Sequence, residues 1–311
     1  MIPTISELGG KTQDFMRWPD PDEPGWSAFN PSIAVSPVHG LGMLIRSSNY
    51  VINDRTGVIQ LLFGQYIMTR IWYAELNDDL SISFLHEIAF DHGDLPIRRG
   101  VEDPRLFWRD DGWHFTAVML EKHTPHSRLC EYRLDTETLT ATFLGKLETE
   151  TPKNPEKNWG PPDVATKEFD YIYSTTHTYR DGKIQPIAGA TKIDAIRGGS
   201  QLLRQKDGTY LAIVHTVKVA SYSAMNTRTF ASEVRWIRDY AHVFVRYSPQ
   251  GKIIEISDEF SFESGGVGIE YAAGMVELGS DLVISYGEVD VASRLCIIPK
   301  DQVEKLLQCT P

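Results

Sequence analysis

The chain has 311 residues, of which 41% are hydrophobic, and a formal net charge of −11 at pH 7. This length and apolar content are enough for a sizeable core, built as two ordinary domains or as one large β or α/β domain. The acidic balance argues against a nucleic acid or an anionic membrane as a partner, because phosphate groups attract basic surfaces. A neutral or locally recognised ligand is the better expectation.

Cysteines and apolar runs bear on the compartment of the protein. The three cysteines, Cys130, Cys296 and Cys309, are too few and too scattered for a disulfide framework or a zinc site. The N-terminal sequence MIPTISELGGKTQDF lacks the basic and apolar regions of a signal peptide. No run of about 18 apolar residues, the length that a membrane span requires, occurs. We therefore expect reduced thiols, a cytoplasmic protein and no membrane partner.

Predicted strands follow one another along almost the whole chain. Short apolar or alternating segments rich in Val, Ile, Tyr and Phe are separated by Gly, Asp-Gly, Asn-Asp and Pro-rich turns. Helical periodicity occurs only in residues 300–308, KDQVEKLLQ. The pattern predicts a mostly β protein with a short C-terminal helix.

The same three-part pattern occurs five times in these strands. Each copy opens with a small or polar residue and an apolar run, at residues 30–33, 103–107, 159–162, 200–203 and 273–276. A second predicted strand follows about ten residues later, at residues 40–48, 112–120, 170–178, 208–216 and 281–289. A third follows at residues 71–77, 127–135, 183–192, 241–249 and 293–301. Candidate fourth strands lie at residues 81–90, 140–148 and 252–260.

The repeat predicts the architecture. Units of roughly 60 residues, each with three or four antiparallel strands, predict a five-bladed β-propeller, which leaves only short protected strand edges. We expect one such propeller over residues 1–311, with blades that start near residues 30, 103, 159, 200 and 273. A β-sandwich is the competing all-β fold, but it would not require five copies of one pattern.

The first strand of each propeller blade lines the central channel, so polar residues at its start face one mouth. This geometry gathers residues that are far apart in sequence: Asn30, Asp103, Asn158 or Trp159, Ser200 and the segment 270–273. The ends of the second strands add an outer ring of Arg46, His215, Tyr286 and Asp290. We therefore expect one pocket lined by carboxylates, cations and aromatic rings.

Carboxylates beside aromatic rings are suited to glycosyl transfer. One protonated acid assists the leaving oxygen, and a second group or an external nucleophile attacks the opposite face of the sugar. A neighbour such as Glu102 would raise the pKa of Asp103, whereas Arg105 would lower it, and the sequence does not decide between them. No motif for metal ligands, a phosphate loop or a serine nucleophile occurs, so we expect metal-free chemistry.

Each of these candidates also has a purely structural interpretation. The run Glu102-Asp103-Pro104-Arg105, taken alone, is typical of a solvated charged turn with a surface ion pair. His215 follows an apolar run and is equally compatible with a buried core histidine. Trp159 would serve as a core residue, and Glu270 would cap a turn.

Six motifs, in this order, make the chain resemble glycoside hydrolase family 130 over roughly residues 30–307. They are Val101-Glu102-Asp103-Pro104-Arg105, Glu156-Lys157-Asn158-Trp159 with the proline pair after it, Gly199-Ser200-Gln201, Tyr240-Ala241-His242, Gly268-Ile269-Glu270-Tyr271-Ala272-Ala273-Gly274 and Ile284-Ser285-Tyr286-Gly287. That family consists of five-bladed propellers that act on β-mannosides, chiefly as inverting phosphorylases and in part as hydrolases.

The resemblance implies a role for each motif. Asp103 would be the general acid, acting on the glycosidic oxygen through a sugar hydroxyl. The substrate would contact Asn30, Arg46, Asn49, Glu102, Arg105, Asn158, Trp159, Ser200, Gln201, Tyr271 and Tyr286. Inorganic phosphate, the expected co-substrate of a phosphorylase, would be held by Arg204, His215, His242 and Asp290. No other cofactor is implied.

The chain departs from the family pattern in its third blade. Phosphorylases of the family usually present an arginine at the end of the second strand, where this chain has Ser174-Thr175-Thr176-His177. Losing one phosphate cation makes hydrolysis, with Glu270 as the base, a competitor of phosphorolysis. A glycosyltransferase and a non-catalytic glycan-binding protein built on the same propeller are further alternatives, and a homo-oligomer stays open.

Overall fold

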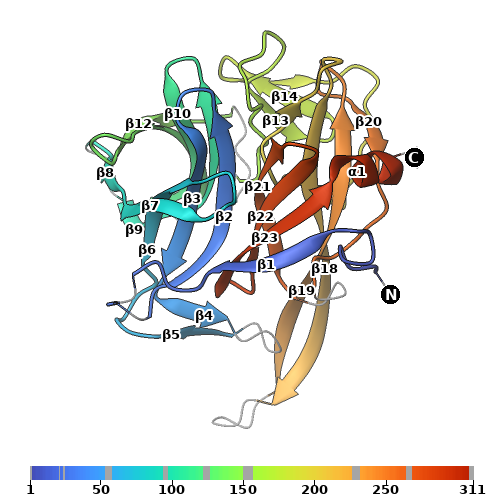
Figure 1. The fold of residues 1–311 in the computed structure, drawn as a ribbon. Coiled ribbons are helices and arrows are strands. Elements are labelled where there is room, and N and C mark those ends of the chain that lie inside the picture. Colours follow the sequence, from blue (N-terminus) through green and yellow to red (C-terminus); the bar gives the residue numbers. More distant parts are fainter. Residues whose placement is uncertain are drawn as a thin grey trace.

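The computed structural model describes residues 2–20, 22–23, 25–52, 58–93, 97–121, 127–149, 157–225, 232–263 and 268–307. Within them the chain is almost entirely β-structure, arranged as five blades, with a short helix near the C-terminus (Figure 1). The all-β, five-bladed propeller predicted from the sequence is therefore confirmed. Helix α1 (Lys300–Leu306) begins where it was predicted, whereas the predicted end at Gln308 lies outside the described residues. In the described part of the chain, no helix is long and apolar enough to cross a membrane.

Blades 1 and 2 are sheets whose first four strands run antiparallel in chain order. Blade 1 consists of β2 (Ser27–Ser36), β3 (Gly40–Ser48), β6 (Thr69–Leu76) and β7 (Ile82–Glu87). Blade 2 consists of β9 (Ile97–Arg109), β10 (Gly112–Glu121), β11 (Ser127–Asp135) and β12 (Thr140–Lys146), with β8 (Ala89–Asp91) parallel to β12 at its edge. The first strands, β2 and β9, contact each other and the first strand of blade 5. The predicted first strands are thus the inner ones, but β2 and β9 begin before the predicted openings at Asn30 and Asp103, because both strands continue through a shift in register.

Blade 3 is the least regular. Its strands are β13 (Tyr171–Ser174), β14 (His177–Arg180) and β15 (Lys183–Pro186). The single strand predicted at residues 170–178 is therefore two strands, because the Ser174 hydroxyl accepts a hydrogen bond from the Thr176 N–H and starts a turn. The predicted opening strand forms only isolated bridges, at Gly160 and Pro162, since prolines cannot donate to a ladder.

Blade 4 contains the longest strands of the described chain. It consists of β16 (Ile196–Arg197), β17 (Leu203–Arg204), β18 (Tyr210–Met225), β19 (Ser232–Tyr247) and β20 (Ile253–Ile256). β18 and β19 pair in register over 16 residues each and extend beyond the blades at the lower side of Figure 1. The sequence pattern predicted only the half of this hairpin that belongs to the blade.

Blade 5 joins the two ends of the chain. It consists of β21 (Glu270–Leu278), β22 (Asp281–Glu288), β23 (Ala292–Pro299) and the N-terminal strand β1 (Lys11–Met16). β1 pairs antiparallel with β23 and so closes the ring. The sequence pattern did not predict β1, which lies before the first repeat. A short hairpin of β4 (Tyr50–Ile52) and β5 (Ile59–Leu61) leaves blade 1 after β3.

Apolar side chains pack between neighbouring blades, and polar groups join the inner strands at the axis. Leu44 of blade 1 and Leu106 of blade 2, for example, belong to one buried cluster. The Ser32 hydroxyl donates to the Ala273 carbonyl at 3.0 Å and accepts from the Leu106 N–H at 2.9 Å. These buried bonds fix the inner strands relative to one another and so position the residues at the mouth.

Candidate active site

Three polar residues with unusual backbone conformations lie in the inner segments of blades 1, 2 and 3. Asn30, Asp103 and Asn158 have φ values of 48°, 51° and 66°. Asn and Asp tolerate this left-handed region better than most residues. In β2 and β9 the ladder also shifts register next to Asn30 and Asp103, which turns their side chains out of the strand pattern. Local backbone geometry thus directs these side chains toward the mouth of the propeller.

Asp103 lies at the centre of this mouth. Its Oδ1 accepts hydrogen bonds from Asn30 Nδ2 at 2.8 Å and from Arg46 Nη1 at 2.9 Å. Arg46 is 4% exposed, lies over the ring of Phe29, and also pairs with Glu102 at 3.0 Å. The Asp103 side chain itself keeps 16% of its surface exposed. A carboxylate is therefore held rigidly but can still be reached from solvent.

The electrostatics at Asp103 answer a question that the sequence left open. Burial alone would raise the pKa of the Asp103 carboxyl, but the charges of Arg46 and Lys157 outweigh it, and the Asn30 bond and Arg105 act in the same direction. The pKa is therefore lowered. In the ligand-free protein, Asp103 is ionised at neutral pH.

Arg105 joins four blades and does not pair directly with Asp103. Its side chain is fully buried, and its Nε donates to the Gly199 carbonyl at 2.6 Å. Its Nη2 donates to Asn158 Oδ1 at 2.9 Å and to the Tyr271 hydroxyl. Burial lowers the pKa of Arg105 to about 10, so the side chain stays a cation at neutral pH.

A tyrosine that sequence reasoning missed connects Asp290 to this cluster. The Tyr50 hydroxyl lies 3.5 Å from Arg46 Nη2 and donates to Asp290 Oδ2 at 2.8 Å. Burial, together with the charges of Asp103 and Glu102, raises the pKa of Asp290 to about 6, although Arg46 and the Tyr50 bond oppose the shift. The sequence offered one signal, since Tyr50 follows the predicted end of the second strand.

Asn49, the residue before Tyr50, shapes a loop and is fully buried. Its amide donates to the carbonyls of Phe63 and Tyr66 at 2.9 Å each, and its Oδ1 accepts from the Met68 N–H at 2.8 Å. These bonds use the polar atoms of the side chain within the protein. Asn49, which was predicted to contact the substrate, therefore holds the loop instead.

The two predicted phosphate histidines are buried and neutral. His215 is 2% exposed and stacks on Tyr240 with 5.0 Å between ring centroids. Burial, aided by the charges of His242, Arg105 and Lys157, places the pKa of His215 well below its usual range. Burial lowers the pKa of the fully buried His242 to about 3. Either ring can donate or accept a hydrogen bond, but neither supplies a positive charge at neutral pH.

The structure does not bring Arg204 together with His215. Arg204 pairs with Tyr210 at one end of β18, five positions before His215 and hence about 16 Å away along the strand. The residues that pair with His215 are His242 in β19 and Arg197 in the short strand β16. Sequence reasoning missed Arg197 because a two-residue strand gives no periodic signal.

Four other predicted contacts are parts of the core. Trp159 is 1% exposed and packs against Tyr173 and Tyr179, and Tyr286 is fully buried and stacks on Phe262. At the axis, Gln201 Nε2 donates to the carbonyls of Ile33 and Met275 at 2.8 Å each. The Ser200 hydroxyl accepts from the Ile213 N–H at 3.2 Å and donates to the Gln201 carbonyl. Their side chains stabilise the scaffold below the mouth.

Glu270, the predicted base, is bonded to the backbone. Its Oε2 accepts from the Phe262 N–H at 2.8 Å and its Oε1 from the Glu263 N–H at 2.9 Å, and only 1% of the residue is exposed. The carboxylate thereby holds the chain that leads into β21. This agrees with the structural interpretation of Glu270, and it leaves neither oxygen well placed to activate a water molecule.

Several buried polar atoms around the mouth have no hydrogen-bond partner among the described residues. They are Asn30 Oδ1, Arg46 Nε, Arg105 Nη1 and His215 Nδ1. Buried polar groups are nearly always paired, so such a group at a site indicates atoms that a ligand can satisfy. Three of these atoms belong to the nitrogen-rich side chains that suit an anion or a sugar hydroxyl.

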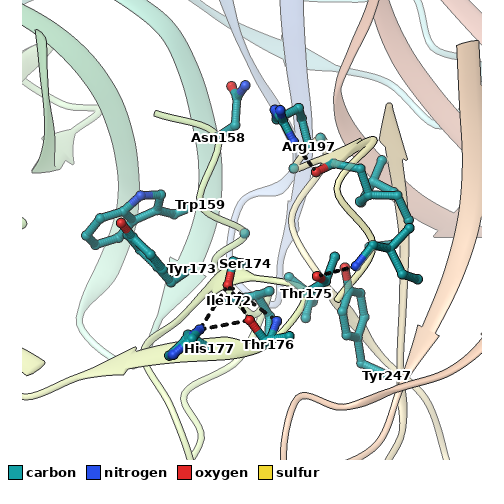
Figure 2. Close-up of a pocket in the computed structure, with 18 of the residues that line it drawn as sticks. Asn158, Trp159, Ile172, Tyr173, Ser174, Thr175, Thr176, His177, Arg197 and Tyr247 are labelled. Carbon is teal, nitrogen blue, oxygen red and sulfur yellow. Dashed lines mark hydrogen bonds between the residues drawn. The ribbon is translucent and has the colours of Figure 1, made fainter. Parts of the chain in front are cut away.

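A cavity of about 660 Å³ lies between blades 3 and 4. It does not include Asp103 or Arg46 in its lining, but it shares Asn158 with the mouth, and its Lys157 acts by charge on Asp103. Figure 2 shows Asn158 and Arg197 at one end of it and the turn of Ser174, Thr176 and His177 at the other. In the turn, Thr176 Oγ1 lies 2.9 Å from His177 Nδ1. The volume is in the range of sites for small organic ligands.

Positive charge predominates on the wall of this cavity. The described lining residues include the cations Lys157, Lys192 and Arg197 and one carboxylate, Asp194. Asp194 is paired with Lys192 at 2.6 Å. In a protein whose net charge is −11, such a wall attracts anions to one place. In the described part of the chain, no group of three or more His, Cys, Asp or Glu residues could hold a metal ion.

Known structures share this architecture. The chain is similar to a β-1,2-mannobiose phosphorylase from Listeria innocua in complex with β-1,2-mannobiose, at 12% identity and a TM-score of 0.61, with 96% of this chain and 99% of that chain covered. A second similar structure is described with the GH130 family of mannoside phosphorylases, which contains glycoside hydrolases that target β-1,2 mannosidic linkages in Candida mannan (17% identity, TM-score 0.58, coverage 89% and 85%). A third is a mannose phosphorylase from Leishmania mexicana with a phosphate ion (13% identity, TM-score 0.53, coverage 93% and 88%). The chain has their fold.

No protein-family model matches the sequence, and no curated protein matches it. At identities of 11–17% the likeness to solved structures establishes the propeller, and it does not transfer an activity. The function has to be argued from the site.

Proposed function

We propose that the protein is a divergent member of glycoside hydrolase family 130 that cleaves a β-mannosidic or similar linkage with inversion, by phosphorolysis. The observation that carries the proposal is Asp103, a solvent-reachable carboxylate held by Asn30 and Arg46 beside a cavity with a cationic wall. A protein that only binds glycans needs no carboxylate positioned in this way. The fold neighbours that act on mannosides with phosphate support the choice of substrate and nucleophile.

In this mechanism Asp103 is the acid. The bound sugar displaces water from the carboxyl, which raises its pKa toward protonation, and the proton reaches the glycosidic oxygen through a sugar hydroxyl. The bond between C1 and this oxygen breaks, and a phosphate oxygen forms a bond to C1 on the opposite face. The proton that dihydrogen phosphate loses restores Asp103. The products are a sugar 1-phosphate and the leaving sugar.

The site favours phosphate over water as the nucleophile. Inverting hydrolysis needs a second carboxylate that can activate a water molecule, and Glu270 is bonded to two backbone N–H groups. Phosphate needs donors and positive charge, which Lys157, Arg197 and the unpartnered Nη1 of Arg105 can provide. His215 can add a neutral hydrogen bond.

Hydrolysis remains the second candidate because of Asp290. The pKa of this carboxyl is raised to about 6, which suits a general base, and Asp290 reaches Arg46 through Tyr50. The turn at residues 174–177 also lacks the arginine expected in phosphorylases. Transfer from a sugar donor is the third alternative.

One assay separates these activities. The protein is incubated with β-1,2-mannobiose and with other β-mannosides, with and without inorganic phosphate, and mannose and mannose 1-phosphate are quantified by chromatography. Sugar phosphate that depends on added phosphate is expected. Free mannose without phosphate would instead assign hydrolysis.

Asp103→Asn keeps the shape of the side chain and serves as the control. It should abolish turnover while the protein remains folded by circular dichroism. An unchanged rate in Asp103→Asn would refute the assignment of the acid. If neither wild type nor variant cleaves any β-mannoside, the result would favour glycosyl transfer or non-catalytic glycan binding.

A further inference from the structure

The guanidinium of Arg46 contacts two carboxyl groups at the mouth of the site and reaches a third through Tyr50. Arg46 lies 2.9 Å from Asp103 and 3.0 Å from Glu102. Tyr50 lies 3.5 Å from Arg46 and donates to the third carboxyl, Asp290, at 2.8 Å. Arg46 is 4% and Tyr50 5% exposed, so solvent screens these charges only weakly.

The backbone holds Asp290 toward this cluster. Val289 and Asp290 have φ values of 49° and 53°, a conformation that residues other than glycine keep only where their surroundings enforce it. Hydrogen bonds from Val289 N–H to the Ile269 carbonyl, at 2.8 Å, and from Val291 N–H to the Glu288 carbonyl, at 2.9 Å, close the turn. Asp290 therefore faces Tyr50 of β4, Arg46 of β3, and Glu102 and Asp103 of β9.

This cluster has more carboxyl groups than directly contacting cations. Glu102 and Asp103 both contact the guanidinium of Arg46, and Asp290 reaches it through Tyr50, so three carboxyl groups gather around one directly contacting cation. Lys157 and Arg105 lower the pKa of Asp103, so this carboxyl gives up its proton first. Burial and the two neighbouring carboxylates raise the pKa of Asp290, so this carboxyl retains its proton longest.

We propose that the protonation of Asp290 controls anion binding at this site. Ionised Asp290 adds one negative charge beside Asp103 that repels an incoming anion, and protonated Asp290 adds none. This rests on the proposed function, because phosphate is the anion that a phosphorylase must bring to Asp103. Asp290 is then a positioning residue that acts through its charge and through Tyr50.

Sulfate is a suitable probe because it stays a dianion between pH 5 and 8. Its dissociation constant for the ligand-free protein is measured by calorimetry across this range. We expect the affinity of wild type to fall roughly tenfold as the pH rises through about 6, the size expected for one added charge at the edge of a partly screened site. In Asp290→Asn, which is neutral at every pH, the affinity should not change with pH. A pH-independent wild type, or no sulfate binding at any pH, overturns the proposal.

Three further variants test whether Asp290 is the group responsible for the pH dependence. Asp281→Asn, at the other end of β22, and His177→Gln, in the neighbouring cavity, should both keep the pH dependence of wild type. Tyr50→Phe removes a hydrogen bond that lowers the pKa of Asp290, so its transition should move to higher pH. If His177→Gln rather than Asp290→Asn abolishes the pH dependence, the proposal is wrong.

The outcome can be separated from that of the mannoside assay. Sulfate binding that depends on Asp290, in a protein that cleaves no β-mannoside, would support the proposal and remove only the proposed substrate. Phosphorolysis by a protein whose sulfate affinity is the same in wild type and Asp290→Asn at every pH would overturn the proposal and leave the proposed function standing.

Discussion

Asn30 and Asp103 are 73 positions apart in the chain and meet at 2.8 Å, with the amide of one donating to the carboxylate of the other. The contact joins β2 and β9, the inner strands of blades 1 and 2, at positions inside both strands. It exists because both residues adopt a left-handed backbone beside a shift in strand register.

Asn30 packs directly against the backbone of Gly287 in the neighbouring blade, so Gly287→Ala should displace Asn30. A Cβ at this position would lie 2.1 Å from Asn30 Oδ1 and 2.6 Å from Asn30 N. Asn30 has to move, and its bond to Asp103 is lost. We expect a destabilisation of about 1–3 kcal/mol and at least a tenfold lower kcat, measured by urea unfolding and by the mannoside assay. In Gly145→Ala, where a Cβ meets no atom within 4 Å, both quantities should stay at the wild-type value.

Glu270→Gln distinguishes a structural carboxylate from a catalytic one. The amide nitrogen of Gln cannot accept from a backbone N–H, so one of the two buried bonds is lost at a cost of about 1–3 kcal/mol. The free energy of unfolding should fall by that amount, whereas kcat should change by less than about threefold. A hundredfold lower kcat with unchanged stability would restore Glu270 as the base. Glu277→Gln, on the exposed part of the same strand, is the control, because Glu277 pairs with the side chains of Lys300 and Gln205 and accepts no backbone hydrogen bond among the described contacts.

The pairing of Arg197 with His215 predicts different outcomes for two arginine substitutions. Arg197→Ala should raise the KM for phosphate about tenfold, the loss expected for one charge-assisted hydrogen bond. Arg204→Ala, at the far end of β18, should leave this KM unchanged. Steady-state kinetics at varied phosphate concentration measures both. A larger effect from Arg204→Ala would contradict the placement of the anion.

The stability of the protein should depend on Asp103 in a defined pH range. The pKa of this carboxyl is lower in the folded than in the unfolded chain, so its ionised form stabilises the fold above the ordinary pKa of aspartate. This contribution is lost as the pH falls below about 4, the ordinary value. Asp103→Asn should therefore be less stable than wild type at pH 7, and the difference should shrink toward pH 3. Urea unfolding at a series of pH values tests this, and a constant difference would refute it.

The predictable part of the site was its location. The repeat pattern placed Asp103 at the start of an inner strand; the structure places it inside β9, at a shift in register, in contact with Asn30 and Arg46. The same pattern placed Trp159 and Tyr286 nearby, but it could not distinguish a residue that faces the mouth from one that packs beneath it. Both are buried, because the core between the blades needs large rings at these levels.

Other residues gave no usable pattern. Strand β1 belongs to no repeat, since it forms the outer strand of a blade whose other strands come from the opposite end of the chain. Arg197 lies in a strand of two residues, which is too short for a periodicity. Tyr50 follows the predicted end of a second strand, which is a signal for the mouth, but nothing near it in the sequence indicates its contact with a carboxyl 240 positions away.

The sequence by itself determined most of the blade strands, their five-fold repetition and the position of Asp103 in that repetition, because alternation of apolar residues and the chemistry of turns are local properties. Only the tertiary structure decided which cation pairs with which carboxylate and where the proton stays. Arg46, Tyr50, Asp103 and Asp290 come from four different strands and turns, and their charges depend on distances and burial that arise when the ring closes. The sequence shows that these four side chains are present, and the closed propeller determines their pKa values.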